Sequence, residues 1–427
     1  MNLSWKLAGP LRLAGEVRPP GDKSISHRCV LLSLLANGRS EIFSISKGGD
    51  VNSTLGIVEA LGAVVSETDG RIVIESKGIQ EPRKILDVGN SGTLLRLATG
   101  MLAGYQGHFV LSGDESVNSR PMDRVIEPLA SMGARITGRS GNRMAPITVL
   151  GSELKGHEFS GLPASAQVKS AILLAGLRAD SPTSVIEVVS TRPHTEEMLQ
   201  EVGVDVEIVD LGGSTRITVH PNSSLKAKSW RVPSDPSQAA FFVVGALITP
   251  RSEVLVKDVL VHKTRTGFLE VLKRMGAQVE LRMKSDSVAD IYASSSKLRA
   301  TDIGGDEIPS VIDELPILAI AAARAEGTSQ ITGAEELRVK ESDRILTSVG
   351  MLRAFGVDVE EHKDGMVITG SDGPFRPSVI ETKFDHRIAM SAAIGSLVAD
   401  GEVEIRDASS VDTSYPGFLA VLLSLVG

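Results

Sequence analysis

The seven residues EALGAVV, 59–65, combine the apolar end of a helix, a glycine and the start of a strand. The other copies of this pattern are ASMGARI (130–136), QEVGVDV (200–206), KRMGAQV (273–279), RAFGVDV (353–359) and the terminal LSLVG (423–427). The successive glycines are separated by 71, 70, 73, 80 and 71 residues. Such even spacing over the whole length indicates an internal repeat rather than chance recurrence among 42 glycines.

Each glycine stands where a helix C-cap needs a left-handed residue, and alternating apolar residues then begin a strand. A turn and a second strand follow, as in VVSETDGRIVIES (64–76) and VEEHKDGMVITGS (359–371), so a β-hairpin is predicted after each helix. The sixth copy has no hairpin of its own, whereas LSWKLAGPLRLAGEV (3–17) has the pattern of a hairpin without a preceding helix. The first residues are therefore predicted to complete the last repeat.

This completion would place both ends of the chain in one domain. The predicted domains are residues 1–19 with 238–427, and an inserted domain of residues 20–237. The candidate crossings are the proline-containing segments RPPGDK (18–23) and VPSDPSQ (232–238). Each repeat has the pattern of two helices and about four strands, which predicts an α/β (α+β) fold with three repeats in each domain.

A second, almost wholly apolar helix is predicted in every repeat, and each begins with polar residues. These helices are DKSISHRCVLLSLLA (22–36), NSGTLLRLATGMLA (90–103), SAQVKSAILLAGL (165–177), PSQAAFFVVGALI (236–248), DELPILAIAAARA (313–325) and FDHRIAMSAAIGSLVA (384–399). Because helices of this composition are buried on all sides, their polar residues gather at their N-terminal ends.

Five cations lie in or near the first turns of these helices: Lys23, Arg28, Arg96, Lys169 and Arg387. The helix macrodipole disfavours positive charge there, whereas a bound phosphate or carboxylate would reverse that penalty. The sequence therefore predicts an anion site built from several helix starts.

Parts of this pattern do not require a ligand. Asn90, Ser165 and Ser237 are explained at least as well as helix N-caps. The stretch PGDKS (20–24) lacks the P-loop spacing, because Asp22 precedes the lysine. The eight histidines show no metal-ligand spacing, so no bound metal is expected.

Two further polar segments lie outside these helices. They are SRPMDR (119–124), with Arg120 and Arg124, and ELRVKESDRI (336–345). For the second segment, a surface lattice of ion pairs accounts for the charges as well as a functional role does.

The composition excludes several classes of protein. The 427 residues carry a formal net charge of -8, which argues against nucleic acid as the main partner. No run of about 18 apolar residues occurs and the first residues lack the apolar core of a signal peptide, so we expect a cytoplasmic protein without membrane insertion. The single cysteine, Cys29, lies in an apolar run and is expected to be a buried structural thiol.

Six motifs resemble, in order and spacing, the 5-enolpyruvylshikimate-3-phosphate synthase family over essentially the full chain. They are GDKSISHR (21–28), GNSGTLLR (89–96), SRPM (119–122), SAQVKSA (165–171), RVKESDR (338–344) and DHRIAMS (385–391). The resemblance implies a two-domain inverse α/β barrel of six βαβαββ repeats, three per domain, with the active site in the cleft between the domains. Closure of the domains on substrate binding is expected from that arrangement.

The resemblance also implies a transferase. Its members move the enolpyruvyl group of phosphoenolpyruvate to the 5-hydroxyl of shikimate 3-phosphate and release phosphate. Both substrates are polyanions, which suits the cations at the helix starts. No cofactor is expected, and the family suggests a monomer.

By the same resemblance, individual residues receive expected roles. Shikimate 3-phosphate would be bound by Lys23, Ser24, Arg28, Ser165, Gln167, Arg192, Asp313 and Lys340. Phosphoenolpyruvate would be held by Lys23, Gly92, Arg120, Gln167, Arg344 and Arg387. Asp313 is the candidate base, and Glu341 is the candidate donor of the proton to the methylene carbon, with Lys23 assisting or sharing that role.

The chain departs from the commonest family pattern at several positions. Ala166 stands where many members have a second serine, Arg192-Pro193-His194 replaces Lys-Pro-Tyr, Glu336 replaces an asparagine, and Thr413 replaces a phosphoenolpyruvate-binding lysine. Arg192 is expected to take over substrate contacts from the missing groups. Sensitivity to glyphosate stays open, since Gly92 favours binding and Thr413 weakens it.

Two other functions are kept as alternatives. The enolpyruvyl transferase that acts on UDP-N-acetylglucosamine resembles this fold but uses a mobile-loop cysteine, and the matching loop here, GDESVNSRPM (113–122), has none. A catalytically inactive binding protein of the same fold is the other alternative, and the presence of Lys23, Asp313, Glu341 and Arg387 argues against it.

Overall fold

The computed structural model describes residues 3–221 and 224–427 and divides the chain into two compact units. Unit 1 contains the residues up to Asp22 and Pro233–Gly427, and unit 2 contains Lys23–Val232. These boundaries differ from the predicted ones at 19/20 and 237/238. The backbone N–H of Asp22 donates to the carbonyl of Pro233 at 2.7 Å, and buried Arg265 forms ion pairs with Asp22 and Asp235. Apart from Lys23 and Val232, with which unit 2 begins and ends, both crossing segments therefore belong to unit 1.

The described residues of unit 2 form three four-stranded sheets. The strands, in spatial order, are β14 (Ser229–Arg231), β3 (Gly38–Phe43), β5 (Arg71–Ser76) and β4 (Val64–Thr68); β6 (Leu86–Asp87), β7 (His108–Ser112), β9 (Met144–Leu150) and β8 (Arg135–Gly138); and β10 (Glu158–Phe159), β11 (Thr183–Glu187), β13 (Thr215–Val219) and β12 (Val206–Asp210). The helices are α1 (Lys23–Leu35), α2 (Gly49–Ala60), α3 (Gly92–Leu102), α4 (Glu115–Asn118), α5 (Asp123–Ser131), α6 (Arg139–Asn142), α7 (Ala166–Gly176) and α8 (His194–Glu201).

In unit 1, the part that the structure describes forms one four-stranded and two three-stranded sheets. Their strands, in spatial order, are β2 (Ala14–Val17), β15 (Glu253–Leu260), β17 (Val288–Ser294) and β16 (Gln278–Ser285); β18 (Gly327–Ile331), β20 (Gly365–Gly370) and β19 (Asp358–His362); and β21 (Ser378–Glu381), β22 (Glu402–Arg406) and β1 (Trp5–Ala8). The helices are α9 (Pro236–Ile248), α10 (Gly267–Arg274), α11 (Ile308–Val311), α12 (Leu315–Ala323), α13 (Arg344–Ala354), α14 (His386–Ser396) and α15 (Phe418–Ser424), with the 3₁₀ helices η1 (Gly305–Glu307), η2 (Glu335–Val339) and η3 (Ala408–Thr413).

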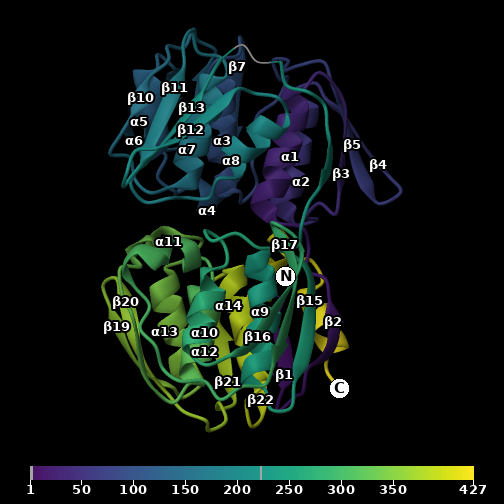
Figure 1. The fold of residues 1–427 in the computed structure, drawn as a ribbon, viewed down its shortest axis with the longest axis vertical. Coiled ribbons are helices and arrows are strands. Elements are labelled where there is room, and N and C mark those ends of the chain that lie inside the picture. The colour runs from purple at the N-terminus through teal and green to yellow at the C-terminus, as the bar shows by residue number, and fades with distance from the viewer. Residues whose placement is uncertain (1–2, 222–223) are drawn as a thin grey trace. The chain divides into compact units, whose positions relative to one another are not determined.

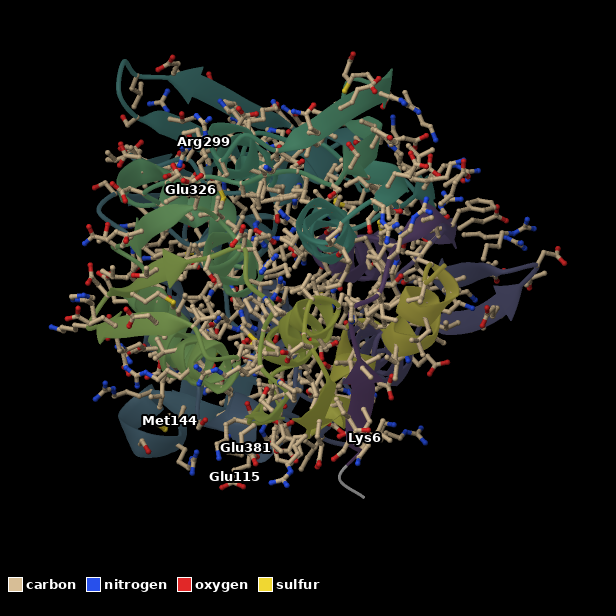
Figure 2. All side chains as sticks on the ribbon, turned by 90° about the horizontal axis from the view of Figure 1, so that it is seen from below. Lys6, Glu115, Met144, Arg299, Glu326 and Glu381 are labelled. Atoms are coloured by element: carbon tan, nitrogen blue, oxygen red, sulfur yellow. The ribbon has the colours of Figure 1, made fainter. Side chains whose placement is uncertain are left out.

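The four-stranded sheets share one pairing pattern. The first strand runs parallel to the second, and the third and fourth form an antiparallel hairpin beside it, as in β6, β7, β9 and β8. In one sheet of unit 1 the first strand is reduced to isolated parallel bridges, one of which joins Arg299 to Glu326, both labelled in Figure 2. The mixed α/β class predicted from the repeat is confirmed.

The repeat glycines occupy the conformation that the sequence predicted. Five of them follow α2, α5, α8, α10 and α13 with φ between 81° and 102°, and they are Gly62, Gly133, Gly203, Gly276 and Gly356. Only glycine adopts this left-handed conformation at little cost, so it ends each helix and turns the chain into the next strand.

The predicted hairpin over residues 3–17 is wrong. β1 pairs antiparallel with β22 and so joins the sheet of the last repeat, but β2 pairs parallel with β15 in a different sheet. Between them, the side chain of Leu13 is fully buried, and its backbone N–H donates to the Ser252 hydroxyl at 2.9 Å. The two strands therefore separate because each finds a partner far away in the sequence.

The six predicted apolar helices all form, and they build the cores. In unit 1, α9, α12 and α14 contact one another, and Figure 1 shows them among the strands of that unit. In unit 2, α3 packs against α7, and α1 contacts α3. Cys29 in α1 is buried, as expected for a structural thiol. In the described parts of the chain, none of the helices combines the length and the hydropathy required to cross a lipid bilayer.

Gly100 allows the close contact between α3 and α7. A Cβ atom at Gly100 would lie 2.2 Å from the carbonyl oxygen of Ala171, whereas one at Gly56 in α2 would meet no atom within 4 Å. Gly100→Ala should destabilise unit 2 by about 1–3 kcal/mol through overpacking and lower its melting temperature by roughly 5 °C. Gly56→Ala is the matched control and should raise the melting temperature slightly, because alanine favours the helix. Calorimetry of both variants measures this, and a shift in the same direction for both would contradict the packing argument.

Candidate active site

The first turns of α1 in unit 2 carry three of the predicted site residues, Lys23, Ser24 and Arg28. Lys23 is the first residue of the helix, and its ammonium forms an ion pair with the Asp50 carboxylate of α2. Asp50 was not predicted, since nothing in its local sequence indicates a functional partner. Its negative charge holds the lysine at the helix start, where the macrodipole would otherwise disfavour a cation.

Arg28 is almost fully buried and connects three helices. Its Nε donates to Thr195 Oγ1 of α8 at 2.6 Å, and Nη2 donates to Ser170 Oγ of α7 at 2.6 Å. Its Nη1 donates to the carbonyl oxygen of Ser24, one turn earlier in α1, at 2.9 Å. These contacts fix the guanidinium, and no sequence motif indicated Thr195 or Ser170 as its partners.

His27 lies between the two cations of α1 and carries no charge at neutral pH. Burial lowers the pKa of His27 well below its usual range, and the charges of Lys23 and Arg28 lower it further. Its ring nitrogens lie 2.6 Å from Thr54 Oγ1 and 3.3 Å from Ser91 Oγ. The imidazole therefore orders neighbouring hydroxyls and adds no third positive charge.

Arg96 joins two of the predicted motifs in unit 2. One guanidinium nitrogen donates to the amide oxygen of Gln167, and another donates to the carbonyl of Pro121 at 3.2 Å. The amide nitrogen of Gln167 in turn donates to Thr93 Oγ1 at 2.8 Å. The starts of α3 and α7 are thus linked to the SRPM segment that contains Arg120.

Gly92 and Arg120 lie against each other. Arg120 Nη2 donates to Asn90 Oδ1 at 2.8 Å and to Ser116 Oγ at 3.2 Å. A Cβ atom at Gly92 would lie only 3.0 Å from Arg120 Nη1. The glycine therefore leaves room for the arginine beside the first amides of α3.

Of the three residues that the sequence offered as N-caps, one acts as a cap. Ser165 caps α7 by accepting from the backbone of Val168. Ser91 rather than Asn90 caps α3, and Asp235 rather than Ser237 caps α9. Asn90 instead binds Arg120 and the Asp114 carboxylate, and Ser237 donates to Glu314.

Lys169 and Arg192 belong to neighbouring parts of unit 2. Lys169 is 2% exposed and forms ion pairs with Glu187 and Glu196. Its charge is matched by carboxylates of the chain itself, so an anionic ligand is not needed to explain it. Arg192 is half-buried and lies in the segment between β11 and α8.

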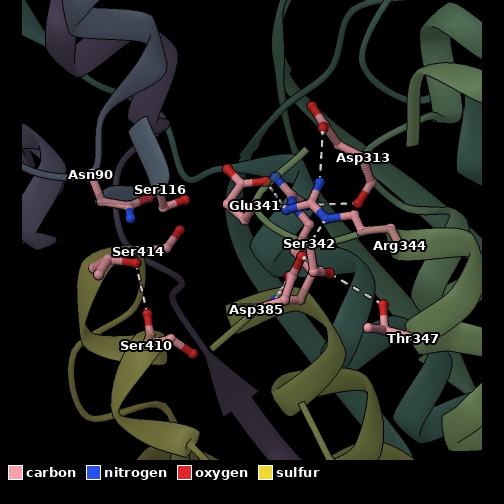
Figure 3. A network of polar contacts seen from close by, with 12 residues as sticks. Asn90, Ser116, Asp313, Glu341, Ser342, Arg344, Thr347, Asp385, Ser410 and Ser414 are labelled. Carbon is pink, nitrogen blue, oxygen red and sulfur yellow. Dashed lines mark hydrogen bonds and ion pairs between the residues drawn. The ribbon is translucent and has the colours of Figure 1, made fainter. Parts of the chain in front are cut away.

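In unit 1, Arg344 is the centre of a group of carboxylates, drawn in Figure 3. This first residue of α13 is 1% exposed, and its Nε donates to Asp385 Oδ2 at 2.8 Å. Its Nη2 donates to Glu341 Oε2 at 2.5 Å, and Nη1 lies 3.7 Å from Asp313 Oδ1. Burial alone would lower the pKa of Arg344, but the three carboxylates outweigh it and raise the pKa above its usual range.

Asp385 connects Arg344 to the start of α14. It caps that helix by accepting from the backbone N–H of Arg387 at 2.9 Å, and it also accepts from Ser342 Oγ at 3.0 Å. Burial is the largest influence and acts to raise the pKa of Asp385, but the charge of Arg344, the hydrogen bond that it donates and the neighbouring His386 together hold the pKa below its usual range. Asp385 lies in the DHRIAMS motif, yet only the structure assigns it these contacts.

Arg387 completes the group around Asp313. Its Nη1 donates to the carbonyl oxygen of Asp313 at 2.8 Å and lies 3.8 Å from Glu314 Oε1. Four predicted residues, Asp313, Glu341, Arg344 and Arg387, are therefore brought together in unit 1. The arrangement offers two carboxylates beside fixed guanidinium groups, which suits proton transfer on an anionic substrate.

Lys340 lies next to this group and is half-buried. Burial lowers its pKa below the usual range, the Asp313 carboxylate partly offsets this, and the Arg344 charge lowers it further. The fold therefore makes the charged form of Lys340 less favourable than it is in water, and a bound anion would favour it again.

The segment 336–345 has a partly exposed part and a buried part. Arg338 forms partly exposed ion pairs with Asp343 at 2.7 Å and Glu361 at 3.0 Å, so the surface lattice exists. Arg344, in contrast, is buried among carboxylates. Glu336 lies in η2, and Thr413, in η3, donates its hydroxyl to the carbonyl of Ser410 at 2.7 Å.

The chain is similar over nearly its whole length to proteins of known function. Residues 7–422 match the model of the family described as EPSP synthase (3-phosphoshikimate 1-carboxyvinyltransferase). A 3-phosphoshikimate 1-carboxyvinyltransferase from Persephonella marina is 46% identical, over 95% of this chain and 96% of that protein. Another from Synechococcus sp. (strain CC9605) is 44% identical, over 95% and 94%. A solved structure of EPSP synthase from Acinetobacter baumannii superposes with a TM-score of 0.87 at 38% identity, covering 100% of this chain and 98% of that one.

Lys340 should limit the stability of unit 1. Because its pKa is lowered in the folded protein, its charge costs stability below the folded-state pKa, and this cost fades as pH rises to the usual lysine value of about 10.4. Lys340→Met should therefore raise the melting temperature at pH 7 and raise it less at pH 10. The exposed Lys363, changed to Met, is the control and should shift the melting temperature little at either pH. A loss of stability in Lys340→Met at pH 7 would contradict this account.

Proposed function

Because this chain belongs to the EPSP synthase family, we propose that its predicted site residues carry out the reaction of that family in the roles given below. The reaction is the transfer of the enolpyruvyl group of phosphoenolpyruvate to the 5-hydroxyl of shikimate 3-phosphate, with release of phosphate. The chain is thus a transferase of the shikimate pathway, which leads to the aromatic amino acids. The family match over residues 7–422 carries this conclusion.

For the fold, we propose six βαβαββ repeats arranged as two inverse α/β barrels, one in each unit. The six sheets, the six apolar helices and the evenly spaced glycines support this arrangement. The two units would be the two domains, with unit 2 inserted into unit 1.

Shikimate 3-phosphate would be bound by the residues that the family resemblance assigns to it: Lys23, Ser24, Arg28, Ser165, Gln167, Arg192, Asp313 and Lys340. In unit 2, Arg28 supports this role, because its contacts to α7 and α8 hold the guanidinium before any ligand binds. Such preorganisation lowers the entropy cost of binding a polyanion. In unit 1, the lowered pKa of Lys340 means that a bound anion would stabilise its charged form.

Phosphoenolpyruvate would be held by Lys23, Gly92, Arg120, Gln167, Arg344 and Arg387. Gly92 supports this role, because its missing side chain leaves the first amides of α3 and Arg120 accessible to the same anion. Arg344 and Arg387 would present fixed guanidinium groups to the phosphate or carboxylate.

Asp313 is the proposed general base, which removes the proton of the 5-hydroxyl while the oxygen attacks C2 of phosphoenolpyruvate. Its position is fixed because its backbone carbonyl accepts from Arg387, and Arg344 lies beside its carboxylate. Addition also delivers a proton to the methylene carbon and forms a tetrahedral intermediate. Elimination then removes a proton from the resulting methyl group as the phosphate leaves.

Glu341 and Lys23 are the proposed carriers of the proton that reaches the methylene carbon. Arg344 donates to Glu341 at 2.5 Å, so the carboxyl group is held in place and its ionised form, which has no proton to give, is favoured. Lys23 is an ammonium paired with Asp50 and already holds a proton. This difference supports a shared role, in which Lys23 assists delivery and Glu341 takes part in both directions of transfer.

The remaining expectations stay part of the proposal: a monomer in the cytoplasm, without cofactor, metal, nucleic acid or membrane as partner. The UDP-N-acetylglucosamine transferase alternative is not favoured by the family match. Cys29, the single cysteine, is buried in α1, where it cannot take the part of a mobile-loop cysteine.

A phosphate-release assay with phosphoenolpyruvate tests the substrate. Turnover is expected with shikimate 3-phosphate and not with UDP-N-acetylglucosamine. Turnover with the UDP-sugar would support the alternative transferase, and no turnover with either would support an inactive binding protein.

Asp313→Asn tests the proposed base. It keeps the shape of the side chain and the backbone carbonyl that Arg387 binds, but it removes the basic oxygen, so kcat should fall at least about a hundredfold. Asp286→Asn, in the exposed turn after β16, is the control and should keep kcat within about twofold. A near-normal kcat for Asp313→Asn would remove Asp313 from this role.

A further inference from the structure

The segment Val188–Pro193 connects the end of β11 at Glu187 to the start of α8 at His194 and contains Arg192. Val188 is 76% exposed, so the segment begins on the surface, where little packing fixes it. If an arginine in such a segment is to contact a substrate in a defined position, both ends of the segment must be held in place.

Lys169 of α7 contacts both ends of this segment. Its ammonium lies 2.9 Å from Glu187 Oε2 and 2.6 Å from Glu196 Oε1. The Lys169 and Glu196 side chains are 2% and 3% exposed, so water competes little for these ion pairs. One cation therefore joins the last residue of β11 to the first turn of α8.

A second contact extends this connection to the residue beside Arg192. The Thr191 hydroxyl donates to Glu187 Oε1, while Glu187 Oε2 binds Lys169. Thr195, directly before Glu196, binds Arg28 and Ser170. Lys169 and Ser170 are adjacent in α7, so two neighbouring residues of one helix hold the start of α8.

Stability alone does not explain this cluster. It places two carboxylates around one ammonium, and Glu196 Oε2 has no hydrogen-bond partner within the described residues. Burial raises the pKa of Glu196 in spite of the opposing Lys169 charge. Apolar side chains of similar volume would be at least as stabilising in such a place, so the cluster is better explained by the geometry it imposes.

We propose that Lys169 is a positioning residue for Arg192: by holding both ends of the segment Val188–Pro193 it sets the arginine in place to bind shikimate 3-phosphate. The inference rests on the proposed contact between Arg192 and that substrate. Lys169 itself touches Glu187 and Glu196 and acts through Arg192.

Lys169→Met keeps much of the side-chain volume and removes the cation. The KM for shikimate 3-phosphate should rise about tenfold, because a charged contact that orients the substrate-binding arginine is lost. The KM for phosphoenolpyruvate and kcat should stay within about twofold. The matched control is Lys228→Met, which removes an ion pair to Glu201 at the other end of α8 and should leave all three constants unchanged.

A double-mutant cycle with Arg192→Ala separates positioning from a merely structural role. If Lys169 acts through Arg192, Lys169→Met should add less than about twofold to the KM for shikimate 3-phosphate once Arg192 is absent. Full additivity, or an equal loss in kcat and in both KM values, would overturn the positioning role. An unchanged KM in Arg192→Ala alone would instead refute the proposed contact of Arg192 with substrate.

Thr191→Val keeps the proposal testable if Lys169→Met does not fold. It is nearly isosteric and leaves the buried charges in place, but it breaks the contact between Glu187 and the neighbour of Arg192. The KM for shikimate 3-phosphate should rise roughly threefold to tenfold, and this effect should vanish beside Arg192→Ala. An unchanged KM in a folded Thr191→Val variant would contradict the proposal.

Discussion

Helices that are buried on all sides impose the main constraint on this protein. Every residue of α9 and of α12 is buried, so neither helix has a face on which a polar side chain could meet water. Polar groups are confined to the N-terminal ends of these helices, where free backbone N–H groups and the macrodipole favour anions. The same burial requires small residues, because Gly100 brings α3 against the backbone of α7. The dense packing and the polar helix starts, which favour anions, thus have one cause.

The cations at these ends are held by the protein's own acidic groups. Asp50 holds Lys23, and Asp385 and Glu341 hold Arg344. A cation alone at a buried helix start would be costly, while one fixed by a carboxylate stays charged and oriented. An overall acidic chain can thus keep fixed positive charges at these helix starts. This pairing also means that each cation must divide its interactions between its carboxylate partner and an anionic ligand when that ligand binds.

Local sequence patterns predicted the parts of the structure that depend on local contacts. The glycine positions, the hairpin over residues 64–76 and the apolar helices follow from the chemistry of a few consecutive residues. The hairpin predicted over residues 3–17 is wrong, because β1 and β2 each pair with a strand hundreds of residues away. The same limit applies to the site. The motifs contain Arg28 and Arg344, but the contacts of Thr195 with Arg28 and of Glu196 with Lys169 follow only once α8 is known to pack beside α7.

The strand pairings between distant residues also set an order of assembly during synthesis. Unit 2 obtains its last strand, β14, at residues 229–231, so all of its sheets can form before α9 is made. The partner of β1 is β22, at residues 402–406. At about 5–20 residues per second, β22 is synthesised roughly 20–80 s after β1. The first strand to be synthesised is therefore among the last to be paired. A chain arrested midway would display a finished inserted unit and a β1 segment still open to chaperones or to the wrong strand edge.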